Sequence, residues 1–216
     1  MQVVDRIKKL GIVPVIRAPS AELASLAIDA VYAGGIDVIE VTMTVPGAVS
    51  LIESLVRRYG DKMVIGAGTV LDAETARACT LAGAAFVVSP IVDEGIIASC
   101  RTYGVPVLPG ALTPTEIVRA VRAGADMVKV FPCGAMGGAS YIKSIKAPLP
   151  NVHLVPTGGV SEKTAGDFIR AGASAIGVGA DLINIDKLLA GDSNALVESA
   201  RRYVAAVQAA RGVAAA

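Results

Sequence analysis

The stretch Ala123-Gly124-Ala125-Asp126-Met127-Val128-Lys129-Val130-Phe131-Pro132 combines a helix end, a glycine turn and an apolar strand. A glycine directly after a helical pattern is typical of the left-handed residue that ends a helix. The unbroken apolar run that follows predicts a strand covered on both faces. Lys129 stands in the middle of that run, although a charged side chain is costly to bury.

The same order of helix end, glycine turn and apolar run occurs three more times in the chain. It recurs at Ala33-Gly34-Gly35-Ile36, Ala82-Gly83-Ala84-Ala85 and Ala171-Gly172-Ala173-Ser174. With the other turn signals it indicates eight strands, each followed by a helix. The predicted strands cover residues 11–17, 37–43, 63–70, 86–90, 106–110, 127–132, 153–159 and 175–178. The predicted helices cover residues 21–33, 46–59, 72–81, 93–103, 113–122, 139–145, 161–170 and 194–210.

This alternation predicts an α/β fold, a (β/α)8 TIM barrel with a short N-terminal helix at residues 5–10. The barrel is expected to form a single domain over residues 1–216. A doubly wound sheet is the alternative, but no G-x-G-x-x-G follows the first strand. Helix N-caps are predicted at Ser20, Asp72, Thr113 and Ser161.

Composition argues against several other classes of protein. The 20 Lys and Arg residues balance 19 Asp and Glu, so no nucleic acid or anionic membrane partner is expected. No signal peptide or membrane span is indicated, and a cytoplasmic location is expected. Cysteines 79, 100 and 133 form no C-x-x-C pattern, which argues against disulfide and zinc frameworks. His153, the single histidine, lies at the amino end of a strand, where a structural role is expected.

Polar residues at the carboxyl ends of the predicted strands are the candidates for chemistry, because barrel enzymes carry their sites there. They are Arg17, Glu40, Thr42, Thr69, Ser89, Lys129 and Thr157. Glu40 and Lys129 belong to even-numbered strands, which contribute to the same layers, so the two side chains are expected to meet. Lys129 is then a desolvated, nucleophilic amine. The alternatives are a lysine that reaches solvent at the rim or a buried ion pair of purely structural value.

Glycine pairs end the last two predicted strands, at Thr157-Gly158-Gly159 and Gly177-Val178-Gly179-Ala180. Backbone amides in such turns can approach an anion, and these two loops are the common phosphate site of the fold. A tight turn explains either pair alone. Gly66 and Gly68 are explained equally well by space for a substrate and by tight packing.

Six motifs in barrel order resemble the class I aldolases that cleave 2-keto-3-deoxy-6-phosphogluconate (KDPG) and 4-hydroxy-2-oxoglutarate (KHG). The motifs are Ile39-Glu40-Val41-Thr42, Gly66-Ala67-Gly68-Thr69-Val70, Val88-Ser89-Pro90, Pro109-Gly110, Lys129-x-Phe131-Pro132 and Pro156-Thr157-Gly158-Gly159-Val160. The resemblance implies that Lys129 forms the Schiff base and that Glu40 is the general acid and base. It also implies a homotrimer that needs no metal or other cofactor.

The expected ligand is a small 2-keto acid. The resemblance implies that Arg17, Thr69 and Thr157 line the substrate pocket. Thr42, Pro90 and Phe131 are the other predicted substrate-binding residues. The predicted phosphate-binding residues are Gly158, Gly159, Gly179 and Ala180.

Two positions depart from the family pattern. Thr44 stands where better-studied members carry an arginine, and Ala180 stands where a serine can bind phosphate. The substrate therefore stays open between phosphorylated and unphosphorylated 2-keto acids. The predicted function is cleavage of KDPG to pyruvate and glyceraldehyde 3-phosphate, and of KHG to pyruvate and glyoxylate. The alternatives are an aldolase for an unphosphorylated or galactonate-derived acid, and a non-catalytic barrel scaffold.

Overall fold

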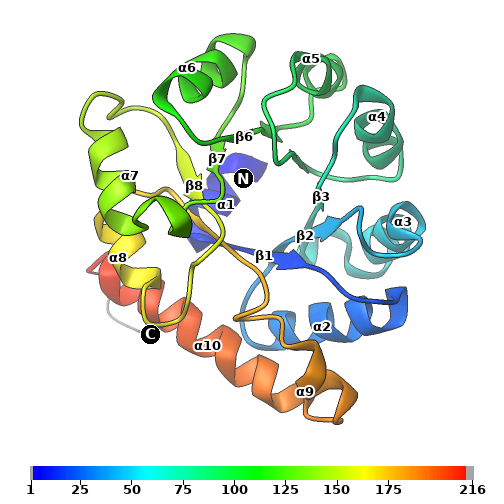
Figure 1. Ribbon diagram of the computed structural model, residues 1–216. Helices are drawn as coiled ribbons and strands as arrows, with labels where there is room; N and C mark the ends of the chain where they lie inside the picture. Colours follow the sequence, from blue (N-terminus) through cyan, green and yellow to red (C-terminus); the bar gives the residue numbers. More distant parts are fainter. Residues whose placement is uncertain (1, 213–216) are drawn as a thin grey trace.

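Strands and helices alternate along residues 2–212, the part of the chain that the computed structural model describes (Figure 1). The strands are β1 (Ile12–Ile16), β2 (Val38–Thr42), β3 (Val64–Gly68), β4 (Val87–Val88), β5 (Val107–Leu108), β6 (Gly110–Ala111), β7 (Val128–Val130), β8 (Leu154–Pro156) and β9 (Ile176–Val178). The α-helices are α1 (Val3–Leu10), α2 (Ala21–Ala33), α3 (Ala48–Tyr59), α4 (Ala73–Leu81), α5 (Glu94–Thr102), α6 (Pro114–Ala123), α7 (Ala139–Lys146), α8 (Ala165–Arg170), α9 (Ile185–Leu189) and α10 (Ser193–Ala210). Two 3-10 turns are η1 (Gly60–Lys62) and η2 (Gly134–Met136).

The parallel strands form a barrel, as the alternation of elements predicts. One sheet has the order β5-β4-β3-β2-β1-β9 and the other the order β6-β7-β8. The predicted fifth strand is split into β5 and β6 at Pro109, whose carbonyl accepts a hydrogen bond from the Lys129 N–H at 3.0 Å. A single bridge between Thr157 and Gly177 joins β8 to β9. The split strand and this bridge connect the two sheets into one ring.

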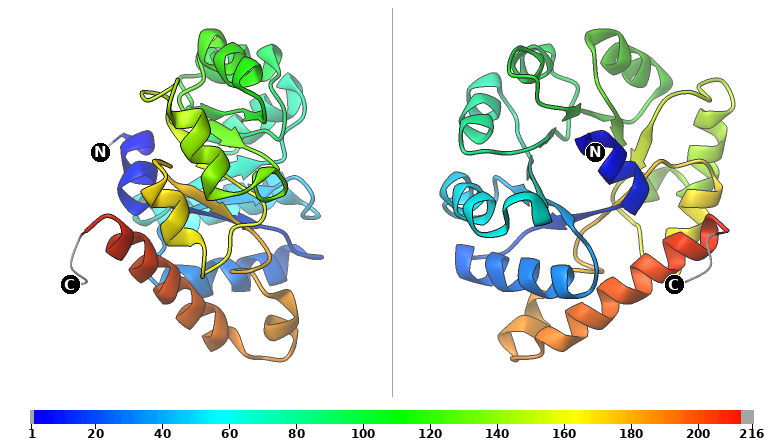
Figure 2. Two further views of the ribbon diagram at one scale, coloured as in Figure 1. Left: turned by 60° about the vertical axis from the view of Figure 1, so that its left-hand side comes forward. Right: turned by 180° about the vertical axis from the view of Figure 1, so that it is seen from behind.

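The interior of the barrel towards its amino end is filled by one apolar cluster. Its members are Val13, Val38, Val64, Phe86, Val88, Leu108, Met127, Val155 and Ala175, with Ile7 from α1. Helix α1 lies across the centre of the ring when the molecule is seen from behind (Figure 2, right). Because side chains two apart on a strand share a face, Glu40 follows Val38 into the barrel and Lys129 follows Met127.

Several predicted turns and caps are confirmed. Gly124 adopts a left-handed conformation with φ of 104°, and at the three equivalent turns Gly35, Gly83 and Gly172 have φ of 93°, 95° and 99°. The Thr113 hydroxyl accepts a hydrogen bond from the Glu116 N–H, and the Glu116 carboxylate accepts one from the Thr113 N–H. This capping box, with Pro114 in the first turn, fixes the start of α6.

Two predictions near the C-terminal end are wrong. Ser161 does not cap a helix, because α8 begins only at Ala165 and the Ser161 N–H donates to the Thr164 hydroxyl at 3.0 Å. The short helix α9 lies between residues 178 and 194, where no helix was predicted. Its N-cap is Asn184, whose side chain accepts from the Lys187 N–H. Five residues carry too little periodicity to be recognised as a helix.

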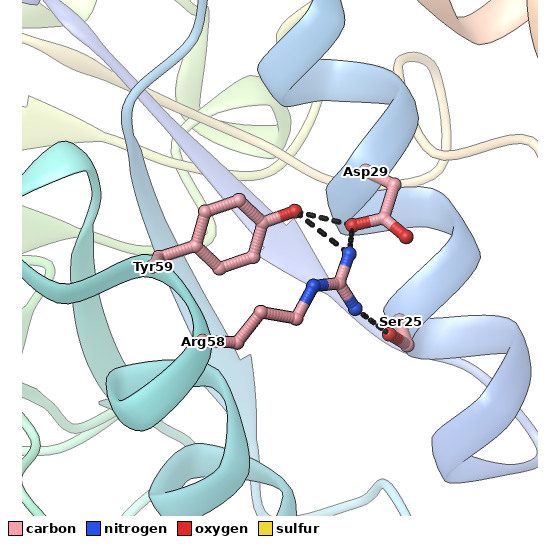
Figure 3. Close-up of polar contacts among 4 residues, drawn as sticks. All are labelled: Ser25, Asp29, Arg58 and Tyr59. Atoms are coloured by element: carbon pink, nitrogen blue, oxygen red, sulfur yellow. Dashed lines mark hydrogen bonds and ion pairs between the residues drawn. The ribbon is translucent and has the colours of Figure 1, made fainter.

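Polar contacts on the outside of the barrel join α2 to α3 (Figure 3). The Asp29 carboxylate accepts hydrogen bonds from Arg58 and from the Tyr59 hydroxyl. The Arg58 guanidinium also donates to the Ser25 hydroxyl at 3.0 Å and lies 4.9 Å from the centre of the Tyr59 ring. The helices that surround the barrel are therefore held by directed contacts as well as by apolar packing. None of the helices in the described range is long and apolar enough to cross a membrane.

Candidate active site

Glu40 on β2 and Lys129 on β7 meet inside the barrel. Lys129 Nζ lies 3.6 Å from Glu40 Oε1, and the two side chains are only 4% and 3% exposed. This separation is an ion-pair distance but is too long for a good hydrogen bond. Within residues 2–212, Glu40 Oε1 has no hydrogen-bond partner. The expected meeting of the two side chains is confirmed, and a lysine that reaches solvent is excluded.

The position of Glu40 favours a carboxyl group that can hold a proton. Burial raises the pKa of the Glu40 carboxyl above its ordinary value of 4.5, and the positive charges of Lys129 and Arg17 only partly oppose that effect. Desolvation disfavours a carboxylate in this way whenever its charge is incompletely compensated. A carboxyl group that holds its proton more firmly than an ordinary glutamate can serve as an acid as well as a base.

Gly68 makes room for the Glu40 side chain. A Cβ atom at Gly68 would lie 2.8 Å from Glu40 Oε1 and 2.9 Å from its Cδ, which is closer than carbon atoms tolerate. At Gly66 a Cβ atom would lie 2.3 Å from the Phe86 ring. Both glycines are therefore required by packing, and Gly68 is required by packing against the candidate catalytic carboxyl.

Phe131 covers the amine from the carboxyl end of β7. The Lys129 Nζ lies 5.3 Å from the centre of the Phe131 ring, within the range of a cation–π contact. On its other side the ring approaches Gly158, where an added Cβ would lie 3.4 Å away. The aromatic ring thus stands between the buried pair and the turn after β8.

A cavity of about 380 Å³ opens at the carboxyl ends of the strands. Neither Lys129 nor Glu40 lines it, and Phe131, whose ring contacts the Lys129 amine, forms part of its wall. Seven of the predicted site residues line it, namely Arg17, Phe131, Thr157, Gly158, Gly159, Gly179 and Ala180. Sequence reasoning missed that Val15, Val160, Ser161, Gly177 and Asp181 also contribute to its walls. Asp181 could have been found from its position directly after the Gly179-Ala180 turn.

The glycine turns that line this cavity carry backbone amides without a hydrogen-bond acceptor in the described chain. Gly158 and Gly159 both adopt left-handed conformations, with φ of 83° and 76°. The N–H groups of Gly158, Gly159, Gly179 and Ala180 donate no hydrogen bond to any other residue of the described chain. Successive unpaired amides in such a turn make a concave site for an anion.

Three predicted substrate-binding residues do not line this cavity, although all three are among the described residues. Thr42 is fully buried, and its hydroxyl donates to the Ile16 carbonyl at 2.9 Å. The Thr42 hydroxyl also lies 2.6 Å from the Thr44 hydroxyl. Because Thr42 uses its only hydroxyl proton for the Ile16 carbonyl, Thr44 is the donor in this second hydrogen bond. Thr69 follows β3 with an uncommon φ of 58°, and Pro90 follows β4 close against Gly110. Their roles stay predictions.

The remaining candidate groups lie away from this site or are protected. His153 Nδ1 lies 3.2 Å from the Ser174 hydroxyl and its Nε2 lies 3.5 Å from Lys8, a contact with the N-terminal helix. The Cys133 thiol is buried, and burial raises its pKa to about 11. Across residues 2–212 no group of three or more His, Cys, Asp or Glu side chains is arranged to hold a metal ion.

The fold and the position of this site define a (β/α)8-barrel protein with a small-molecule site at the carboxyl ends of its strands. Within that class, residues 3–199 match the family model described as KDPG and KHG aldolase. The chain belongs to this aldolase family, as the six motifs suggest.

Similar proteins include aldolases for two different sugar acids. The chain is 33% identical to the 2-dehydro-3-deoxy-6-phosphogalactonate aldolase of Escherichia coli K12, over 93% of this chain and 98% of the relative. It is 32% identical to the KHG/KDPG aldolase of the same organism, over 89% and 90%. A crystal structure of KDPG aldolase from Legionella pneumophila, with pyruvate captured as a covalent carbinolamine, superposes with a TM-score of 0.85 at 27% identity and covers 93% of this chain and 97% of that one.

Proposed function

We propose that this protein is a class I aldolase that cleaves 2-keto-3-deoxy-6-phosphogluconate reversibly to pyruvate and glyceraldehyde 3-phosphate. The same chemistry extends to 4-hydroxy-2-oxoglutarate, which would give pyruvate and glyoxylate. One observation carries the proposal, the buried approach of Lys129 Nζ to Glu40 Oε1 at 3.6 Å. A buried lysine beside a carboxyl that can exchange a proton is the pair of groups that Schiff-base chemistry requires.

The first half of the proposed reaction forms the iminium ion. The neutral Lys129 amine attacks the 2-keto carbon and gives a carbinolamine. Glu40, whose pKa is raised by burial, donates the proton with which the hydroxyl leaves as water. The Phe131 ring, 5.3 Å from the amine, then stabilises the cationic imine.

The second half breaks the carbon–carbon bond. Glu40, now a carboxylate, takes the proton of the C4 hydroxyl, and the C3–C4 bonding electrons move into the iminium to give an enamine. Glyceraldehyde 3-phosphate leaves, the enamine is protonated at C3, and water hydrolyses the imine to release pyruvate. Because the iminium is the electron sink, this route needs no metal ion.

The cavity supplies groups for both ends of the substrate. Arg17 and Thr157 line it, and Arg17 has no ion-pair partner among the described residues. Arg17 is proposed to pair with the pyruvyl carboxylate, with Thr157 and, from outside the cavity wall, Thr69 donating hydrogen bonds. The free amides of Gly158, Gly159, Gly179 and Ala180 are proposed to bind the phosphate. Without a serine at position 180, the backbone carries more of this binding.

A galactonate-derived substrate is the second candidate. It is supported by the 33% identity to the phosphogalactonate aldolase over nearly the full length of both chains. The two acids differ in configuration at C4, so cleavage rates measured on both, and on 4-hydroxy-2-oxoglutarate, distinguish the candidates. By family resemblance we also propose a cytoplasmic homotrimer, which light scattering and fractionation would test.

Borohydride reduction in the presence of pyruvate tests the chemistry directly. Trapping is expected on the peptide that contains Lys129 and is expected to be lost in Lys129→Met. Lys146→Met is the matched control, because Lys146 is another lysine with a lowered pKa, caused by burial, and its amine donates to the Pro150 and Val152 carbonyls. Absence of trapping would leave the barrel scaffold as the better explanation, and trapping that survives Lys129→Met would refute Lys129 as the Schiff-base residue.

A further inference from the structure

The two glycine turns that line the cavity are tied together by one carboxylate. Asp181, directly after Gly179-Ala180, accepts a hydrogen bond from the Glu162 N–H at 3.1 Å, and Glu162 belongs to the loop that begins with Gly158-Gly159. The same Asp181 oxygen accepts a hydrogen bond from the Tyr203 hydroxyl. Asp181 therefore joins the loop after β8, the loop after β9 and helix α10.

Helix α10 makes a second contact with the same region. Arg202, the neighbour of Tyr203, donates to both oxygens of the Glu162 carboxylate, at 2.9 and 2.8 Å. Helix α10 is also packed against α8 and α2 along the outside of the barrel (Figure 2). Both loops are thus anchored to a long helix that contributes no residue to the cavity wall.

The Tyr203 hydroxyl can donate its hydrogen bond to Asp181 at every pH at which the protein is folded. Its side chain is completely buried, and burial together with the hydrogen bond to Asp181 raises the pKa of its hydroxyl far above the ordinary value of 10.0. Its hydroxyl therefore keeps its proton throughout the range in which a protein works.

The presence of Asp181 in an anion cavity otherwise has no simple explanation. A carboxylate at the edge of such a site repels a bound phosphate and lowers its affinity. Its hydrogen bonds to both loops supply a compensating role, since amides fixed in advance bind an anion more tightly than amides that must first be ordered.

We propose that Tyr203 and Asp181 are positioning residues that set the separation between the Gly158-Gly159 amides and the Gly179-Ala180 amides, and so the affinity for phosphate. The phosphate here is that of the substrate, so this inference rests on the proposed function. Neither residue is proposed to touch the reacting atoms. Their effect is therefore confined to anion binding and leaves imine formation unchanged.

Binding of inorganic phosphate to the whole protein, measured by titration calorimetry, tests the inference. Tyr203→Phe removes only the hydroxyl and is expected to weaken phosphate binding between about threefold and about tenfold, the value of one hydrogen bond. The rate of borohydride trapping with pyruvate is expected to stay the same. Tyr103→Phe is the control, because Tyr103 is exposed and its hydroxyl receives a hydrogen bond from Arg77 far from the cavity.

Asp181→Ala separates positioning from simple charge repulsion. Repulsion alone predicts that removal of this exposed carboxylate tightens phosphate binding, whereas loss of the tether predicts weaker binding. Tighter or unchanged binding in Asp181→Ala, unchanged binding in Tyr203→Phe, or no phosphate binding to the wild-type protein would each overturn the inference. Failure of the wild-type protein to be trapped with pyruvate would instead refute the proposed function. Failure of the proposed function can therefore be distinguished from failure of the positioning inference.

Discussion

Lys129 Nζ and Glu40 Oε1 lie 3.6 Å apart in a part of the barrel from which solvent is almost completely excluded. A buried ion pair contributes little to stability, because the cost of desolvation offsets the attraction between the charges. This pair also lacks the hydrogen bond that would improve the balance. Its geometry is better explained by chemistry than by stability, and the first predictions address it.

Glu40→Gln is expected to keep imine formation at a reduced rate and to lose turnover by about 10²- to 10⁴-fold, the usual contribution of a general acid and base. The amide keeps the shape of the side chain but cannot exchange a proton. Single-turnover trapping with pyruvate and steady-state cleavage assays measure the two effects separately. Unchanged turnover would remove Glu40 from the mechanism.

The pH profile of kcat, which reports groups in the enzyme–substrate complex, is expected to show an acidic limb above pH 4.5, the ordinary pKa of a glutamate. Burial raises the pKa of Glu40, so below the raised pKa a Glu40 carboxylate in the iminium complex regains a proton from solvent and cannot accept the C4 proton. Activity should therefore fall as the pH decreases through the raised pKa. The residual activity of Glu40→Gln should lack this limb, and a limb that persists there would belong to another group.

Gly68→Ala is expected to impair turnover more than stability. The new methyl group would lie 2.8 Å from Glu40 Oε1, so the carboxyl must move away from the amine. Cleavage rates and thermal unfolding measure the two effects. Gly166→Ala is the control, because the nearest atom there, at 3.1 Å, is the free end of the Arg170 side chain. An equal loss of activity in the control would contradict the prediction.

The three thiols are expected to be unreactive in the folded protein. Cys79, Cys100 and Cys133 are buried, and burial raises the pKa of each thiol to about 11, so little thiolate exists near neutral pH. A colorimetric disulfide reagent should detect all three only after denaturation. Fast reaction of a thiol in the native state would show that its burial is incomplete in solution.

Asp29→Asn is expected to lower the free energy of unfolding by about 1 kcal/mol, because it weakens the hydrogen bonds that join α2 to α3 (Figure 3). Asp167→Asn is a suitable control. Asp167 pairs with Arg170 on one turn of α8, and both side chains are more than half exposed, so a change within about 0.5 kcal/mol is expected. Urea unfolding of both variants measures which contact contributes more to the free energy of unfolding, the one between helices α2 and α3 or the one within α8.

The barrel could be predicted because its signals are local. The turns at Gly35, Gly83, Gly124 and Gly172 and the capping box at Thr113 each depend on a few neighbouring residues. The interruption at Pro109 could not be predicted locally, because it reflects a new partner strand. The late start of α8 is a local effect, because the Ser161 N–H donates to the Thr164 hydroxyl in a turn that competes with the helix.

The candidate site was predictable to the same extent. Alternation along β2 and β7 is enough to direct Glu40 and Lys129 into one interior, and their contact is confirmed. Thr42 could not be interpreted from its position alone, because its hydroxyl is engaged by the Ile16 carbonyl of the neighbouring strand. The hydrogen bond between Asp181 and Tyr203 joins a loop to helix α10, and no local sequence pattern predicts it.

The pairing of β1 with β9 has a consequence for synthesis on the ribosome. Ile12 on β1 pairs with Ile176 on β9. The edge of β1 that β9 covers therefore stays unpaired until β9 has been synthesised. At translation rates of about 5–20 residues per second, that wait is on the order of ten seconds or more. An uncovered strand edge is a template for pairing with other chains. The nascent chain is therefore most exposed to aggregation, and most dependent on chaperones, until β9 has left the exit tunnel.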